Sequence, residues 1–441
     1  MNVTRRVART AFIALLSLFC ISVAAVRGQD AGGGAAGGQK YTMAEYNAYQ
    51  AAAAEKNPAA QLKLLDDFVS KYPNSALLNY IYTLYFSNYG NAKNFPKTIE
   101  YCDKLIALGD KASPAERYQA YSVRAYAYNN TPNPDAATAT AARAAALAGV
   151  KAVDALQKPE GVDQAKFDQQ KKESITMFNG TAANAAMVAK DYPGAIESYK
   201  TILQTAPDDL ISNYNLGKAY MAINPPQQLD ALWYFARAAS SKSANAQQAT
   251  QVKTYLRKLL AAYQGGTVCD AVTDAELNEL LQLSSTSTER PASYKLFSSA
   301  ELTAAQKDMT IASVVTDLKG GGDKAKLTWT ASCGLEFPDV PGKIIEITPG
   351  TDSTQLKTAF VTSDAEFDAA TTPNMDVKVV GQPDAAKLEK GNPVRFTGTL
   401  VSYDPDPAFM LHWDKAKVNE EDLPKDNKKP AAKKPAAKKP S

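Results

Sequence analysis

Histidine is nearly absent from this chain, and cysteine is scarce. The 441 residues include one histidine, His412, and four cysteines. Zinc sites are built mainly from His and Cys ligands, and many hydrolases use a His base, so the sequence offers neither kind of site. A disulfide framework is not expected either, because such frameworks need many cysteines in a short chain. We expect His412, which precedes Trp413, to be a surface or packed residue and not a ligand.

The common motifs of nucleotide and ester chemistry are also missing. The glycine run at 320–322 is not followed by the Lys-Ser/Thr pair of a phosphate loop, and no Gly-x-Ser-x-Gly elbow occurs. Neighbouring acids such as Asp66 and Asp67 point apart on a helix or loop, which is typical of solvated surface. We therefore predict that the protein is not an enzyme and needs no cofactor and no metal.

The first 25 residues have the composition of an export signal. Arg5, Arg6 and Arg9 precede an apolar run at 11–23, which is short for a membrane span, and small residues follow it. We predict a signal peptide at 1–25, with an uncleaved N-terminal anchor as the alternative. The protein is then periplasmic or otherwise exported to a bacterial cell envelope, with no transmembrane span in the mature chain. Residues 26–40 form a Gly/Ala linker.

Charge is unevenly distributed along the chain. The sequence has 49 Lys and Arg against 46 Asp and Glu, and residues 425–441 hold seven Lys and one Asp. The rest of the mature chain is therefore mildly acidic, so we do not expect a nucleic-acid partner. Within 421–441 the Lys-Lys-Pro-Ala-Ala repeat predicts a disordered tail. The tail either only solubilises the protein or tethers it to an anionic envelope surface.

Residues 41–264 have helical periodicity with a 34-residue repeat. If Thr176 is position 1, large apolar, small and proline residues recur at set positions in two successive units. The first unit has Tyr192 at 17, Ala195 at 20, Tyr199 at 24 and Pro207 at 32; the second, from Leu210, has Leu216 at 7, Gly217 at 8, Tyr220 at 11, and Ala231 and Phe235 after a short insertion. A small residue at 8 or 20 lets two helices cross closely, and large ones fill the space between helix pairs.

These residues resemble the tetratricopeptide repeat family. The resemblance implies an α-solenoid of about five helix pairs at 41–264. With the small β-rich domain that the pattern of the later residues predicts, we expect a mainly α-helical chain. It also implies that the protein is a scaffold, in which the first helix of each pair lines a groove that binds a protein or peptide. Positions that face such a groove are Asn184, Met187, Tyr214, Asn215, Lys218 and Met221. Asn179 and Asn213 occupy position 4, where the family has Trp.

The C-terminal part has a different pattern. We expect a helical linker region at 265–319, with helices near 275–283 and from 299 onward, and a small β barrel or sandwich at 320–420. The predicted strands are 325–330, 343–348, 376–380, 394–401 and 409–413. Residues 391–418 are weakly similar to the late hairpin of OB-type barrels. An alternative function follows: the β-domain binds an envelope oligosaccharide and the repeats serve as a spacer.

Two groups of side chains leave alternatives open. Cys102 falls at an apolar repeat position, so we expect a buried thiol. Cys269 and Cys333 either pair as a disulfide or remain two buried free thiols. The tyrosines of the second predicted pair, among them Tyr80 and Tyr85, either pack between helices or form a stacking surface for a peptide.

Overall fold

The computed structural model describes residues 41–405 and 407–424. The predicted signal peptide, the Gly/Ala linker and the Lys-rich repeat from residue 425 lie outside the described residues. The chain divides into two compact units at Val252, and each unit is described by itself. Within the described ranges, no helix is both long enough and apolar enough to cross a membrane.

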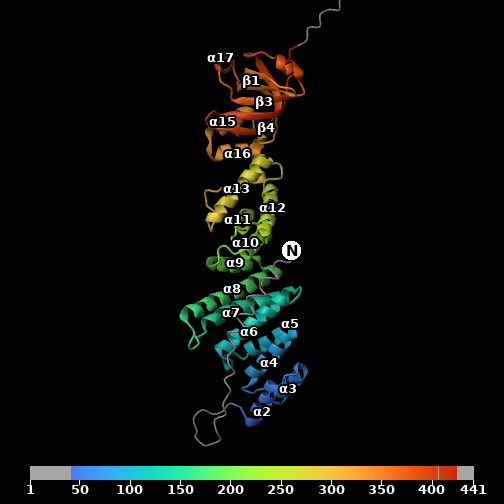
Figure 1. The fold of residues 1–441 in the computed structure, drawn as a ribbon, viewed down its shortest axis with the longest axis vertical. Helices are drawn as coiled ribbons and strands as arrows, with labels where there is room; N and C mark the ends of the chain where they lie inside the picture. The colour runs from blue at the N-terminus through green and yellow to red at the C-terminus, as the bar shows by residue number, and fades with distance from the viewer. Residues whose placement is uncertain (1–40, 406, 425–441) are drawn as a thin grey trace, which may run out of the picture. The chain divides into compact units, whose positions relative to one another are not determined.

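The first unit consists of helices joined by short turns (Figure 1). They form five consecutive pairs within residues 41–239, as the repeat pattern predicts. The helices are α2 (Met43–Ala54), α3 (Pro58–Lys71), α4 (Leu78–Asn91), α5 (Phe95–Ile106), α6 (Pro114–Asn130), α7 (Ala136–Asp154), α8 (Gln164–Val188), α9 (Tyr192–Thr205), α10 (Leu210–Ala222) and α11 (Gln228–Ala239), with the 3-10 turn η1 (Gly109–Lys111) after α5.

Local sequence sets where these helices begin. Ser113 caps α6: its hydroxyl accepts from the Glu116 backbone, Glu116 bonds back to Ser113, and Pro114 occupies the first turn. Such a box satisfies backbone donors that would otherwise lack a partner. The residues from Ser113 to Glu116 therefore set the start of α6.

Each helix packs against the next one along the chain, and first helices of neighbouring pairs also touch, as α4 does α6 and α6 does α8. The pair α10–α11 crosses closely at Gly217, where an added Cβ would lie 3.1 Å from both the Ala231 carbonyl oxygen and the Phe235 ring. Glycine at this point is therefore needed to bring the two helices together. Helix α8 begins at Gln164, well before Thr176, so it extends beyond the 34-residue unit.

Asn213 occupies a buried position in α10 and is fully satisfied by hydrogen bonds. Its amide nitrogen donates to the carbonyls of Pro207 and Asp209, both at 2.9 Å, and its oxygen accepts from Arg237 Nε at 3.2 Å. Arg237 is buried as well and donates to Pro207 at 2.7 Å. A polar network therefore fills the place where the repeat family has a Trp ring.

The second unit begins with helices and ends with a barrel. Its helices are α12 (Ala246–Tyr263), which starts in the first unit, α13 (Asp270–Thr286), α14 (Ser299–Lys307), α15 (Ile311–Gly320) and α16 (Gly322–Ser332). The strand predicted at 325–330 is wrong: these residues belong to α16. Its buried Ala325, Thr328 and Ser332 are spaced for one face of a helix, although the Thr and Trp content favoured a strand. The single helix expected from 299 onward is two helices, and Thr310 caps the second.

Five strands form a closed barrel in the order β1-β2-β3-β5-β4. All neighbours are antiparallel except β3 and β5, which run parallel. The elements are β1 (Glu336–Pro349), β2 (Ser353–Phe360), α17 (Asp364–Ala369), β3 (Met375–Val380), η2 (Pro383–Lys387), β4 (Pro393–Asp404) and β5 (Met410–Val418). The alternative of a sandwich is thus excluded, and β2 was not predicted because polar Thr354 and Thr358 are buried in it.

The barrel core is aromatic and aliphatic. Phe337 and Phe396 both pack edge-on against Trp413, with ring centroids 5.7 and 5.5 Å apart. Val314 and Leu318 of α15 belong to the same core. Helix α15 is therefore part of the barrel's hydrophobic packing.

The cysteines settle one of the open alternatives. Cys269, which precedes α13, and Cys333, which follows α16, form a disulfide. Cys102 is buried and free, and burial raises the pKa of its thiol well above its usual range. The disulfide joins α13 to the start of the barrel within the second unit.

Candidate functional site

Four of the six residues predicted to face a groove line one hollow of about 730 Å³ in the first unit. Asn184 and Met187 come from α8, and Asn215 and Lys218 come from α10. The remaining lining residues come from the ends of α6 and α8, from α9 and from nearby turns: Lys93, Phe95, Tyr128, Asn129, Asn130, Thr131, Pro132, Pro134, Val188 and Tyr199. The hollow thus collects residues from four helix pairs.

The other two predicted residues do not line this hollow. Tyr214 packs edge-on against Phe235 of α11, with ring centroids 5.4 Å apart. Met221 is half-buried near the end of α10. Helical position alone placed both in the groove, but Tyr214 instead fills space between the helices of its own pair.

Tyr199 organises the two asparagines of the hollow. Its hydroxyl donates to Asn184 Oδ1 at 2.8 Å. Burial raises the pKa of Tyr199 well above its usual range, and a hydrogen bond with the Asn215 side chain opposes that shift. Tyr199 therefore remains a donor at any ordinary pH. Because its oxygen is occupied, Asn184 presents its amide nitrogen to the hollow, and its side chain is exposed.

Positive charge in the hollow is not balanced by the protein. Lys93 and Lys218 are exposed, and neither forms an ion pair within the described part of the chain. No Asp or Glu is among the lining residues. A ligand carboxylate would meet two ammonium groups here and no opposing charge from the wall.

The rest of the wall is apolar. Phe95, Pro132, Met187 and Val188 contribute to it, and Val188 is unusually exposed for its type at 42%. The Tyr128 hydroxyl is buried without a hydrogen-bond partner beneath the same surface. An apolar wall with a few polar groups is typical of ligand-binding hollows.

A second hollow, of about 750 Å³, continues along α8. It shares Asn129, Asn130 and Asn184 with the first. Asn129 donates to Thr181 Oγ1 at 2.8 Å, and Asn130 donates to the Tyr126 carbonyl at 2.9 Å. The side-chain oxygens of both asparagines have no partner among the described residues. The two hollows together form one surface, which we call the α8 groove.

Sequence reasoning missed part of the α8 groove. Lys93, Asn129 and Asn130 lie in pairs whose sequences follow the 34-residue frame poorly, so no groove positions were assigned there. The adjacent asparagines Asn129 and Asn130 at the end of a Tyr- and Ala-rich helix were the only available signal.

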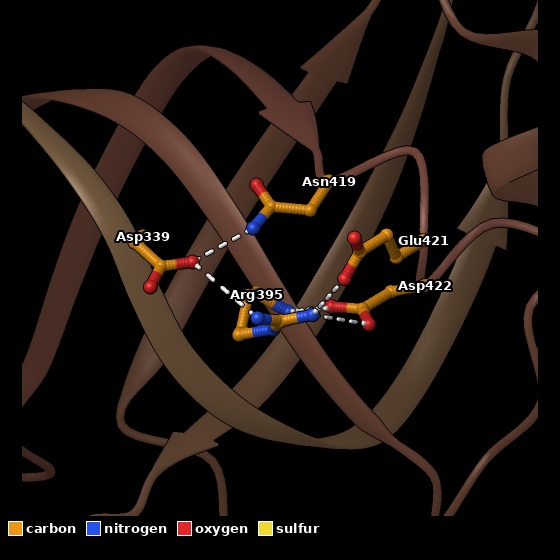
Figure 2. Close-up of polar contacts among 5 residues, drawn as sticks. All are labelled: Asp339, Arg395, Asn419, Glu421 and Asp422. Atoms are coloured by element: carbon orange, nitrogen blue, oxygen red, sulfur yellow. Dashed lines mark hydrogen bonds and ion pairs between the residues drawn. The ribbon is translucent and has the colours of Figure 1, made fainter.

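The barrel has a polar cluster of another kind, shown in Figure 2. Arg395 of β4 bonds to Asp422 through Nη2 at 3.1 Å and to Glu421 at 3.3 Å. Asn419 donates to Asp339 at 2.7 Å. Hydrogen bonds to Asp422 and Glu421 raise the pKa of Arg395. These groups satisfy one another and hold the last described segment on the barrel.

His412 lies between two acids on the barrel surface. Its Nε2 is 2.8 Å from Asp404 Oδ2, and its Nδ1 is 3.4 Å from Asp376 Oδ2. Across residues 41–405 and 407–424, no group of three or more His, Cys, Asp or Glu side chains is arranged to hold a metal ion. Asp404 and Asp376 therefore flank both ring nitrogens of His412 at the surface.

The barrel shows no exposed row of aromatic side chains in its described part. Within 320–405 and 407–424 every Phe, Tyr and Trp is buried or half-buried. Tyr403 packs against Trp329 of α16, with ring centroids 5.0 Å apart, and against Phe409 at 6.4 Å. A stacking platform for sugars needs exposed rings, and the described part of the barrel has none. The barrel therefore has fewer groups suited to a sugar than the α8 groove has groups suited to a peptide.

Comparison with protein-family models and with curated proteins finds no match for this chain.

Proposed function

We propose that the protein is a non-enzymatic scaffold of the bacterial cell envelope that binds a protein or peptide partner in the α8 groove. The observation that supports this most strongly is the set of unpartnered polar groups that meet there. Asn184 offers donors, Asn129 and Asn130 offer acceptors, and Lys93 and Lys218 offer positive charge, all beside an apolar wall.

The chemistry of the groove suits an extended peptide segment. Peptide backbones present alternating N–H and C=O groups, which asparagine side chains can pair with in either direction. Lys93 and Lys218 favour a segment with a carboxylate, and the apolar wall favours a hydrophobic side chain next to it. We propose an acidic segment with at least one apolar residue as the bound element.

The family assignment is part of this proposal. The frame at 176–243, the five helix pairs and the close crossing at Gly217 support tetratricopeptide repeats. For the barrel, the order β1-β2-β3-β5-β4 supports an OB-type fold. Neither assignment identifies a ligand by itself, because function depends on the site and not on the fold.

A matched pair of charge reversals tests the proposed function. Lys218→Glu places a carboxylate in the α8 groove, and Lys417→Glu makes the same change at an exposed position of the barrel. Full-length wild type and both variants are used to capture proteins from envelope extract, with quantitative mass spectrometry. We expect at least one protein to be recovered with wild type and Lys417→Glu but lost with Lys218→Glu.

Other patterns of recovery would reject the proposal. If wild type and both variants recovered the same partner proteins in equal amounts, the α8 groove would not be the binding surface. Selective loss with Lys417→Glu would favour the barrel, and binding of purified envelope polysaccharide by full-length protein would then test the oligosaccharide alternative. Export is tested separately: mass spectrometry of protein purified from the envelope should place the mature N-terminus between Ala25 and Gln29, and an intact Met1 would contradict the assignment.

A further inference from the structure

A buried carboxyl group lies between two helices of the second unit. Glu276 of α13 is 4% exposed, and Gln264, directly after α12, is 1% exposed. Gln264 Nε2 donates to Glu276 Oε2 at 2.7 Å. Glutamate is almost never buried to this extent unless its charge is balanced, so the surroundings of Glu276 need an explanation.

The remaining oxygens of the pair have no partners. Glu276 Oε1 and Gln264 Oε1 are both buried without a hydrogen bond, and so is the Tyr294 hydroxyl. With Glu276 ionised, both oxygens of the pair are acceptors and neither can satisfy the other. A single proton on Glu276 Oε1 would turn one of them into a donor, which removes the cost of two unsatisfied buried groups.

Charged groups from the neighbouring elements do not neutralise Glu276. Lys326 of α16 bonds to Glu279 at 2.9 Å and lies over the Tyr294 ring, 5.5 Å from its centroid. Glu279 adds a like charge from the same helix as Glu276. Arg290, in the segment after α13, acts electrostatically on Tyr294. Glu276 therefore has no ion pair of its own within the described residues.

We propose that Glu276 and Gln264 form a proton-controlled latch between α12 and α13: when Glu276 is protonated, Oε1 donates to Gln264 Oε1 and closes a two-hydrogen-bond pair. When Glu276 is ionised, the two oxygens oppose each other and the contact loosens. We expect this loosening in the segment from Gln264 through residue 298, within which Cys269 remains bonded to Cys333.

The titration of Glu276 agrees with this geometry. Burial, the largest cause, raises the pKa of Glu276 to about 6; the hydrogen bond from Gln264 and the charge of Lys326 lower it, and Glu279 raises it. A carboxyl group whose pKa is higher in the folded than in the unfolded protein favours folding in its protonated form. The contribution is thus fully present below the ordinary pKa of 4.5 and is lost as pH rises to about 6.

Hydrogen exchange of the full-length protein at pH 5 and pH 7.5 tests the latch. Glu276→Gln preserves both hydrogen bonds without a titrating group, and Glu289→Gln makes the same change at an exposed position. After correction for intrinsic rates, we expect wild type and Glu289→Gln to lose up to about eightfold protection across 264–298 between pH 5 and pH 7.5, the change expected for a carboxyl group with a pKa of 4.5 in the unfolded and about 6 in the folded protein. Glu276→Gln should keep its protection.

Equal pH dependence in wild type and Glu276→Gln would overturn the latch. If Glu276→Gln does not fold, titration of carbon-13-labelled Glu side chains in wild type decides instead. One carboxyl signal with a midpoint near 6 supports the latch, and its absence overturns it.

Discussion

The α8 groove and the Arg395 and Lys378 clusters of the barrel are both polar, but their polar groups differ in whether they have partners. On the barrel, Arg395 bonds to Asp422, and Lys378 lies 3.7 Å from Asp414. In the groove, Lys93 and Lys218 have no ion-pair partner among the described residues. A charge that is satisfied within its own chain has little to offer a ligand, whereas the groove offers donors, acceptors and positive charge together.

An exposed lysine alone would not support this contrast, because most exposed lysines are simply solvated. The groove differs because its lysines adjoin a hollow with an apolar wall and several unpartnered amide groups. The following predictions alter one region at a time, so that the two regions can be compared directly.

The largest effect is expected from removing the disulfide. The Cys269–Cys333 bond closes a loop with a sequence separation of 64 residues. The chain-entropy estimate for such a loop is about 4 kcal/mol of stability. We expect the double substitution Cys269→Ser and Cys333→Ser to lower the stability of the second unit by up to this amount in urea unfolding, and to leave binding in the groove unchanged. Three free thiols in the denatured wild-type protein would contradict the bond itself.

The next largest effect is expected at the close crossing of α10 and α11. Gly217→Leu forces a side chain against the Ala231 carbonyl and the Phe235 ring, which we expect to destabilise the first unit by about 3 kcal/mol. Gly180 of α8 is the matched control, because a Cβ there meets nothing within 4 Å. Urea unfolding should show little loss for Gly180→Leu. If the two variants unfolded at similar urea concentrations, the repeat positions counted from Leu210 would be wrong.

A small effect is expected at Arg395. Its side chain is 41% exposed, and surface ion pairs contribute at most about 1 kcal/mol because solvent screens them. We expect Arg395→Met to shift the unfolding midpoint of the second unit only slightly and to increase hydrogen exchange in the segment after Val418. Loss of partner binding in this variant would show that the cluster in Figure 2 is more than a structural support.

The repeat positions predicted the helix pairs more accurately than they predicted which residues line the groove. The helix pairs at 176–243 could be predicted because close packing constrains residue size at certain positions, among them Tyr199, Gly217 and Phe235. Side-chain direction is not constrained in the same way, so Tyr214 was placed in the groove although it packs on Phe235.

The barrel was harder to predict from sequence. Strand β2 alternates buried and half-buried residues, but two of the buried ones are Thr354 and Thr358, so no hydrophobic alternation is visible. Residues 325–330 have β-branched and aromatic content and yet form a helix, because Gly321 and Gly322 allow a sharp turn with positive φ between α15 and α16. Long-range packing thus determined the structure of β2, and a local turn determined where α16 begins.

The most direct test of the central claim is photo-crosslinking from the two surfaces in full-length protein. A photoreactive residue at position 187 replaces Met187 in the α8 groove, and one at position 417 replaces Lys417 on the barrel. After irradiation in envelope extract, we expect a discrete protein adduct at position 187, suppressed by Lys218→Glu, and no adduct of matching mass at position 417. A discrete adduct only at position 417, or one at 187 that Lys218→Glu leaves intact, would contradict the account.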